Sequence, residues 1–348
     1  MASVRIGVVF DTPYARYTPD DHHRQMEKEL GGDTPNEPEM EYQVGRALEE
    51  NGHEVLLVGV HDDPREVLDR CAEWKPELVV NCAESFRGES RLDHLFPALL
   101  EAGGYHYTGS PPLALQVSRD KEISKKILAF HGIKVPGFIT YRTNEEVNDP
   151  PSLRFPLIVK PNSADASEGI AQASVVEDLE ALKERVAFVH QRFEQPAIVE
   201  EFIVGRELYV SVIGNDDRLE PLPLTELVFD KEKNAPEERF ATQSAKWDEA
   251  YRRRKGVRNV FARPVSAAAR ERIDAICRTA FHSLWLRDYA RIDLRLTEDD
   301  EVWMIEANAN PFISRGHEIA NAAEKAGMAY PAFIQRIVSE AMARHATA

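Results

Sequence analysis

The chain has 348 residues, more than one hydrophobic core usually serves, so two or three sub-domains are expected. Hydrophobic residues make up 43% and charged residues 29%, as in ordinary soluble globular proteins, and the net charge of −16 disfavours nucleic acid and anionic membranes as partners. Three widely spaced cysteines, no membrane-length apolar run and no signal-peptide pattern predict a cytoplasmic protein with reduced thiols.

The first third of the chain alternates apolar strands with amphipathic helices. Strands are predicted at 4–10, 54–58 and 78–81, and helices at 40–51, 65–74 and 94–103. A βαβαβ order calls for a parallel sheet with helices on its faces. No GxGxxG motif follows the first strand, so a dinucleotide site has no support.

A polar segment at 11–38 interrupts this order and contains several Asp, His, Pro and Gly residues. A connection of that length is either mobile or a functional flap. Its pair His22–His23 could suggest a metal, but no third ligand stands at a helical spacing. A solvent-exposed loop is therefore the preferred interpretation of the histidine pair.

A second unit is predicted to begin near residue 113, after a hinge-like turn. It comprises a helix at 120–131, a strand at 155–161, a small polar loop at 162–169 and a helix at 179–193. Lys160 ends the strand, and the small residues after it would let backbone N–H groups approach phosphate oxygens. A lysine that merely reaches solvent is the alternative.

From residue 197 onward the pattern is mainly antiparallel, with strands at 197–202 and 207–213. Glu200 and Glu201 end the first of these strands, and Glu207 follows a turn. Such carboxylates can accept hydrogen bonds from ribose, although an ordinary acidic turn is an equal alternative. A charged, weakly structured span at 229–256 precedes helices at 266–286, 317–326 and 331–344.

A hairpin predicted over residues 288–311 holds the most specific polar pattern. Alternate side chains of a strand share a face, so Arg291, Asp293 and Arg295 lie together, as do Met304, Glu306 and Asn308. If these faces coincide, three oxygen ligands converge beside an arginine, which suits a hard cation and a phosphate. The alternative is a merely solvated face, but Glu306 and Asn308 follow a buried-type apolar run, which favours the site.

The ordered set of motifs resembles the ATP-grasp superfamily, and within it the D-alanine–D-alanine ligase-like branch. The matching segments are NCAESFRGES (81–90), YTGSPPLALQVSRDKEISK (107–125), GIKVPGF (132–138), PLIVKP (156–161), IVEEFIVGRE (198–207), AKW (245–247), YARIDLRL (289–296) and IEANANP (305–311). The resemblance covers roughly residues 78–330 and implies an α/β and α+β architecture. It comprises an N-terminal Rossmann-like domain at 1–112, a central sub-domain at 113–196 and a C-terminal sub-domain at 197–348.

The resemblance also implies how the site is used, with ATP between the last two sub-domains and two Mg²⁺ ions at its phosphates (Mn²⁺ being an alternative). It assigns ATP contacts to Lys121, Lys160, Glu200, Glu201, Ile203, Glu207 and Met304, the last packing under the adenine. It assigns the metal to Asp293, Glu306 and Asn308, and catalytic roles to Arg291, Lys246 and Ser167. Lys246 falls on a mobile loop that closes over the γ-phosphate, which makes 229–256 the expected lid.

The departures from the family pattern concern the substrate rather than the nucleotide. The loop after the lysine-proline reads Ala164–Ser167, which leaves only Ser167 of the family's two serines. The family's N-terminal glutamate has only ambiguous counterparts in Glu37, Glu39 and Glu41. Pro311–Phe312 stands where a glycine is usual after Asn308, and His317 falls near a serine that binds the second product carboxylate.

These departures favour an ADP-forming carboxylate–amine ligase that joins an amino acid or small carboxylic acid to an amine and does not use the D-alanine pair. D-alanine–D-alanine ligation proper is the main alternative. A kinase-like enzyme and a non-catalytic ATP-binding protein are further alternatives. The expected partners are small molecules, and a homodimer is an expectation because ligases of this branch often dimerise.

Overall fold

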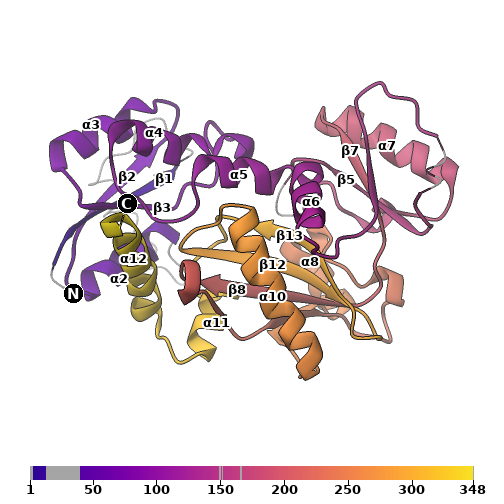
Figure 1. Cartoon of the computed structure of the whole chain (residues 1–348). Coiled ribbons are helices and arrows are strands. Elements are labelled where there is room, and N and C mark those ends of the chain that lie inside the picture. The colour runs from indigo at the N-terminus through magenta and orange to yellow at the C-terminus, as the bar shows by residue number, and fades with distance from the viewer. Residues whose placement is uncertain (1–2, 13–39, 149, 151, 165–166, 348) are drawn as a thin grey trace.

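The computed structural model describes residues 3–12, 40–148, 150, 152–164 and 167–347 (Figure 1). The predicted segment 11–38 lies outside the described residues apart from its first two, and His22–His23, Glu37 and Glu39 lie outside them too. Three sheets organise the described chain, with three, six and four strands.

The first sheet is parallel and has the strand order β2-β1-β3. Its strands are β1 (Arg5–Asp11), β2 (Glu54–Val60) and β3 (Leu78–Asn81), and its helices are α2 (Met40–Glu50), α3 (Arg65–Trp74), α4 (Leu95–Gly103) and the final helix α12 (Tyr330–Thr347). Ile6 and Val8 of β1 pack in one apolar cluster with α2 and α12, whereas Val9 packs in another with α3 and α4. Helices thus cover both faces, and the predicted parallel βαβαβ sheet is confirmed.

The second sheet is antiparallel and has the order β4-β7-β5-β6. Its strands are β4 (Phe138–Tyr141), β5 (Leu157–Pro161), β6 (Val175–Val176) and β7 (Ala197–Glu201), and α7 (Leu179–Phe193) packs on one face. The predicted division before residue 197 separates β7 from this sheet, but β7 pairs with both β4 and β5. We therefore propose that the division between the last two sub-domains falls after β7.

The third sheet is antiparallel, with the order β11-β10-β8-β12-β13 and β9 beside β8. Its strands are β8 (Arg206–Ile213), β9 (Glu220–Pro221), β10 (Thr225–Val228), β11 (Arg258–Phe261), β12 (Tyr289–Leu296) and β13 (Val302–Asn308). One face packs against α5 (Pro112–Arg119), α6 (Lys121–Phe130) and α10 (Ala267–Ser283). The described chain also contains α11 (Glu318–Lys325) and four short 3-10 turns, η1 (Ser90–Leu92), η2 (Gln172–Ser174), η3 (Asp216–Arg218) and η4 (Pro236–Glu238).

The span 229–256, expected to be weakly structured, contains two short helices. They are α8 (Gln243–Trp247) and α9 (Glu249–Lys255), and each begins at a side-chain cap. Thr242 accepts a hydrogen bond from the backbone N of Ala245, and Asp248 accepts one from that of Tyr251. These caps satisfy N–H groups that a helix start leaves unpaired, which explains why such short helices form.

A β-bulge interrupts the pairing of β12 with β13. Asp293 pairs with Glu306 and Leu294 pairs with Met304, so Ile305 has no partner on β12. The extra residue shifts the alternation of β13, and the core receives Val302, Met304 and Ala307. Met304 and Glu306 therefore lie on opposite faces, and the prediction that they share one face is wrong.

A buried carboxylate joins segments that are distant in the sequence. Asp288, which is fully buried, accepts hydrogen bonds from the backbone N of Gly109 at 2.8 Å and from Asn215 Nδ2 at 2.9 Å. Arg344 of α12 pairs with both its oxygens, at 3.0 and 2.9 Å. The C-terminal helix is thereby tied both to the start of β12 and to the turn that precedes α5.

Candidate active site

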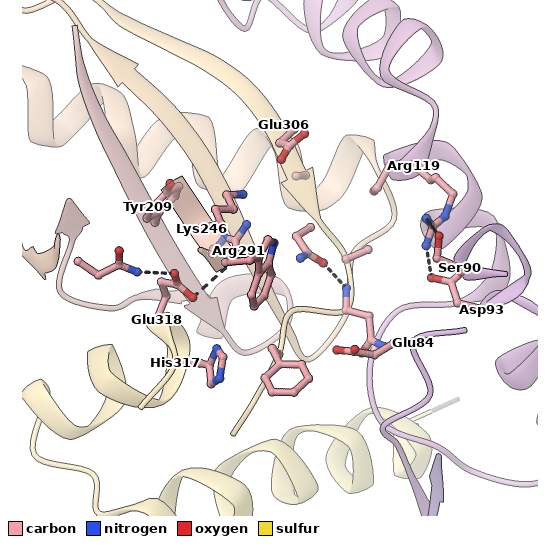
Figure 2. A pocket seen from close by; sticks show the side chains of 18 of the residues that line it. Glu84, Ser90, Asp93, Arg119, Tyr209, Lys246, Arg291, Glu306, His317 and Glu318 are labelled. Carbon is pink, nitrogen blue, oxygen red and sulfur yellow. Dashed lines mark hydrogen bonds and ion pairs between the residues drawn. The ribbon is translucent and has the colours of Figure 1, made fainter. Parts of the chain in front are cut away.

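Two cavities meet beside the ends of β12 and β13. The outer cavity has a volume of about 530 Å³ and the inner cavity about 60 Å³. Lys246 and Glu306 line both of them, and in Figure 2, which shows the outer cavity, both side chains are labelled. A group bound in one cavity can therefore reach a group bound in the other at these two side chains.

The inner cavity lies between the second and third sheets and collects most of the side chains predicted for the nucleotide. They are Lys160, Glu200, Glu201, Ile203 and Glu207, with Ser167, Lys246, Asp293 and Glu306 beside them. Lys121 is adjacent, because its Nζ lies 3.9 Å from Glu306 and donates to the carbonyl of Ala164 at 2.5 Å. The structure thus brings residues from five separated stretches of the chain to one place.

Met304 is the exception among the predicted nucleotide contacts. It is fully buried in the core between the sheet and the helices, and it does not line either cavity. Ile305 lines the inner cavity instead. The physical reason is the bulge, which turns Ile305 and Glu306 toward the same side, so the assignment of Met304 is wrong.

A buried network of charges holds the wall of the inner cavity. Glu200 receives Lys160 Nζ at 2.8 Å and Lys125 Nζ at 3.3 Å, and Lys125 also donates to the carbonyl of Ile305 at 2.6 Å. Burial would raise the pKa of Glu200, but Lys125 and Lys160 bring it below its ordinary value. Burial lowers the pKa of Lys125 to about 8. Sequence reasoning missed Lys125, although it stands one helical turn after Lys121.

Glu207, predicted to bind ribose, is held by three donors. Tyr209 Oη donates to one carboxylate oxygen at 2.9 Å, while Arg295 and the backbone N of Ala241 donate to the other at 2.8 and 2.9 Å. Ala241 precedes α8, so this carboxylate joins the third sheet to the segment that carries Lys246. Its fixed orientation is what a specific hydroxyl acceptor requires.

The predicted metal ligands face one another across the bulged hairpin. Asp293 and Glu306 are cross-strand partners, and Asn308 pairs with Arg291 two residues further along. Burial raises the pKa of Asp293 to about 6, although Arg291 binds it with two hydrogen bonds. Burial would also raise the pKa of Glu306, but Lys121, Lys246 and Lys160 lower it to about 2. Two carboxylates and an amide oxygen this close fit a divalent, oxygen-binding cation, which would relieve the repulsion between the carboxylates.

We expect affinity for a divalent cation to rise as the pH increases through 6. A protonated Asp293 cannot ligate, and its raised pKa keeps it protonated below that value. Titrations with Mn²⁺ followed by electron paramagnetic resonance at about pH 5 and about pH 7.5 would measure the difference. Asp293→Asn, which has no carboxyl proton to lose, is the control and should bind weakly at both pH values. Equal wild-type affinities would contradict the assignment.

Arg291 connects the two cavities electrostatically. Its guanidinium lies against Asp293 at 2.7 Å, approaches Glu318 at 3.8 Å and covers the ring of Tyr209 at 5.1 Å. Burial acts against its charge, but Asp293 and Glu318 raise its pKa, so it stays charged in the wall of the outer cavity. This position gives a fixed donor at the place where the two cavities meet.

Ser167, predicted to help hold the substrate, lines the inner cavity and not the outer one. Its backbone adopts φ of 62°, a left-handed conformation that is uncommon for serine. Its neighbours 165–166 lie outside the described residues. The serine therefore lies at the inner cavity together with Lys246, and its contact with a substrate stays a prediction.

The outer cavity contains polar residues that sequence reasoning missed. On the wall formed by α5 and the loop before α4, Arg119 pairs with Asp93 at 2.6 Å, and Ser90 and Glu84 lie nearby (Figure 2). On the opposite wall, Glu318 accepts a hydrogen bond from Asn259 at 2.8 Å. No simple spacing joins these residues, and only the folded chain brings them together. Phe312 and His317 line this cavity as well.

Comparison with known proteins identifies the family of this chain. The family model described as D-ala D-ala ligase C-terminus matches residues 127–339. The uncharacterized protein y4sG of Sinorhizobium fredii is 34% identical over 307 residues, which are 87% of this chain and 87% of that protein. The D-alanine–D-alanine ligase of Desulforudis audaxviator is 31% identical, covering 90% of this chain and 98% of the relative. The chain belongs to the D-alanine–D-alanine ligase family.

The fold agrees with this family. The crystal structure of D-alanine–D-alanine ligase from Bacillus anthracis complexed with ATP has a TM-score of 0.72 at 20% identity, with 98% of both chains covered. The architecture is therefore the ATP-grasp fold, as the motifs predicted. The protein is an ATP-dependent ligase of the D-alanine–D-alanine ligase type. Among the residues that the structure describes, no helix is long and apolar enough to cross a membrane.

Proposed function

We propose that this protein is an ADP-forming carboxylate–amine ligase that works through an acyl phosphate. The observation that supports this most directly is the pair Lys246 and Glu306, which lines both the inner and the outer cavity. ATP in the inner cavity would present its γ-phosphate there, and a carboxylate in the outer cavity would attack it. Phosphoryl transfer depends on positioned charges and on the exclusion of water, and it needs no covalent bond to the protein.

Most of the predicted residues then have a task in this reaction. Lys121, Lys160 and Lys246 offset charge on the phosphates, and Glu201, Ile203 and Glu207 hold the nucleoside. Asp293, Glu306 and Asn308 would hold two Mg²⁺ ions, which when bound offset the phosphate charge during transfer. In the second step an amine attacks the acyl carbon, and Arg291 donates to the oxyanion that forms.

The segment before and within α8 acts as the lid. Phe240 and Ala241 line the inner cavity, whose volume of about 60 Å³ is much smaller than an ATP molecule. Entry of ATP therefore requires movement of these walls, and we assign that movement to 229–256. Closure over the nucleotide would bring Lys246 to the γ-phosphate and protect the acyl phosphate from water.

The substrate pair that we propose is not D-alanine with D-alanine. Phe312 and His317 line the outer cavity, and the ion pair of Arg119 with Asp93 forms another part of its wall. An aromatic ring where the family usually has a glycine, and an imidazole near the family's serine, change both the size and the polarity of the acceptor region. A different amino acid, a peptide or another small carboxylic acid suits this altered cavity better than the D-alanine pair does.

The test is a screen for ADP release over paired amino acids and small carboxylic acids, with amines and hydroxylamine as acceptors. We expect ADP and phosphate only when the correct acid is present, and a hydroxamate when hydroxylamine replaces the amine. AMP with pyrophosphate would exclude the acyl-phosphate route. Phosphate release with D-alanine alone would instead establish D-alanine–D-alanine ligation.

The same screen separates the remaining alternatives. A kinase-like enzyme would release ADP without giving a hydroxamate, because its phosphorylated product is not an acyl phosphate. A non-catalytic ATP-binding protein would bind ATP but release no ADP with any pair. Either result would remove the ligase proposal.

A further inference from the structure

His317 lies where the outer cavity continues into a third, side cavity. The side cavity has a volume of about 420 Å³ and shares Glu84, Phe312 and His317 with the outer cavity. His317 is the residue before α11, and its ring packs against that of Phe312 with the centroids 4.5 Å apart. Figure 2 shows His317 beside Glu318, on the wall that also carries Arg291. The imidazole thus stands in the passage between the reaction centre and the side cavity.

Ligation requires a base close to the acceptor amine. An amine that reaches the acyl phosphate at neutral pH is an ammonium ion, which has no lone pair and cannot attack carbon. One proton must therefore be removed before the new bond forms. A side chain that accepts it has to line the outer cavity and has to be unprotonated near neutral pH.

Among the described residues that line the outer cavity, the other titratable groups fit this task poorly. Lys246, Arg119, Arg252 and Arg291 have donor-type side chains, and burial keeps the phenol of Tyr209 protonated by raising its pKa. Asp93 is engaged by Arg119 at 2.6 Å. The carboxylates Glu306 and Glu318 are weak bases, because nearby cations lower the pKa of each despite burial. Glu84 is a carboxylate and intrinsically a much weaker base than imidazole.

We propose that His317 is the general base that takes a proton from the ammonium group of the acceptor amine. This inference rests on the proposed ligase function and adds a catalytic residue to it. Histidine is the side-chain type that changes protonation near neutral pH, and its unprotonated ring nitrogen accepts a proton directly. The position between the two cavities lets the acceptor pass the imidazole on its way to the acyl carbon.

The step balances without any further reagent. The ammonium gives one proton to a ring nitrogen of His317, and the freed lone pair forms the C–N bond with the acyl carbon. Collapse of the tetrahedral intermediate breaks the bond between that carbon and the phosphate oxygen. The second nitrogen proton leaves with the phosphate, and the imidazolium returns its proton to solvent.

The charges around His317 determine the form of the expected pH profile. Glu318 is its neighbour in the chain, Glu84 lines both cavities with it, and Arg291 faces it from β12. Asp11 and Glu41 line the side cavity with it, and no lysine or arginine is among the described lining residues there. Protonation of the imidazole removes the base, so kcat for the acceptor amine should fall as the pH decreases.

The test compares two nucleophiles in His317→Gln, using the acid identified by the ADP-release screen. Amino acids from the same screen serve as ammonium acceptors, and hydroxylamine serves as an acceptor that is already unprotonated at neutral pH. We expect a loss of about 10²-fold or more in kcat with the amino acid near pH 7, which shrinks as the pH rises. The loss with hydroxylamine should be much smaller.

Other outcomes would overturn the inference. Equal losses with both nucleophiles would mean that His317 positions a group rather than moving a proton. A pH-independent rise in KM for the amino acid would mean that it binds a carboxylate. His282→Gln, an exposed histidine on α10, is the matched control, and His317→Asn with thermal unfolding guards against a folding defect. If wild-type protein forms no hydroxamate with any acid, the ligase proposal itself fails.

Discussion

Glu306→Gln is expected to reduce ADP formation by about 10³-fold or more, equivalent to ~4 kcal/mol of transition-state stabilisation. Glu306 lines both cavities, is the cross-strand partner of Asp293, and has its carboxylate 3.9 Å from Lys121. Glutamine has a similar shape but cannot offset cationic charge. The measurement is the steady-state rate of ADP release with saturating ATP and Mg²⁺, together with the affinity for ATP.

Glu298→Gln is the matched control, since it removes one carboxylate from the exposed tip of the same hairpin. It should retain close to the full rate. Because we expect Glu306 to stabilise the phosphoryl group mainly during its transfer, kcat should fall much more than the affinity for ATP. A Glu306→Gln variant with normal kcat would exclude this carboxylate from the reaction.

Arg344→Met is expected to lower the free energy of unfolding by about 3–5 kcal/mol. The substitution removes the cation from Asp288, a fully buried carboxylate that receives Arg344 at 2.9 Å. The remaining donors, Gly109 and Asn215, are neutral and cannot balance the charge. Urea denaturation followed by fluorescence and circular dichroism would measure the change.

Arg253→Met provides the comparison, because it breaks an ion pair whose side chains are 73% and 83% exposed. Exposed pairs contribute only about 0–1 kcal/mol, so this variant should unfold nearly as the wild type does. Asp288→Asn in the Arg344→Met background should recover part of the loss, since it removes the buried charge. If Arg344→Met is as stable as Arg253→Met, Asp288 does not depend on its partner.

Strands and helices with a clear pattern of apolar and polar residues could be predicted from the sequence. Strand β1 is a continuous apolar run, and a strand buried on both faces must read that way. Arg291 and Asp293 alternate with Ile292 and Leu294, so one face of β12 could be assigned to the site before any contact was known. The residues that line the inner cavity could be grouped from the sequence because several of them, such as Lys160, Glu200 and Glu306, lie at or near the ends of strands.

What could not be predicted depends on contacts between distant segments. The bulge at Ile305 leaves no local mark, since an apolar residue in an apolar strand fits either alternation. Asp93 and Arg119 are 26 residues apart and meet only because the loop before α4 packs beside α5. The helices α8 and α9 are too short for periodicity to reveal them. Thr242 and Asp248 could be recognised as their caps only from the hydrogen bonds of the folded chain.

The bulge has a consequence for how β13 tolerates changes in length. Removing one residue from a strand normally exchanges its buried and exposed sides from that point on. Removing Ile305 alone would leave Met304 directly before Glu306. Strict alternation would then keep Met304 on the core face of the sheet and Glu306 on the opposite face. What such a deletion takes away is the carbonyl that accepts the ammonium of Lys125 and one wall of the inner cavity. A deletion of Ile305 should therefore fold and yet bind nucleotide poorly, unlike deletions elsewhere in β13.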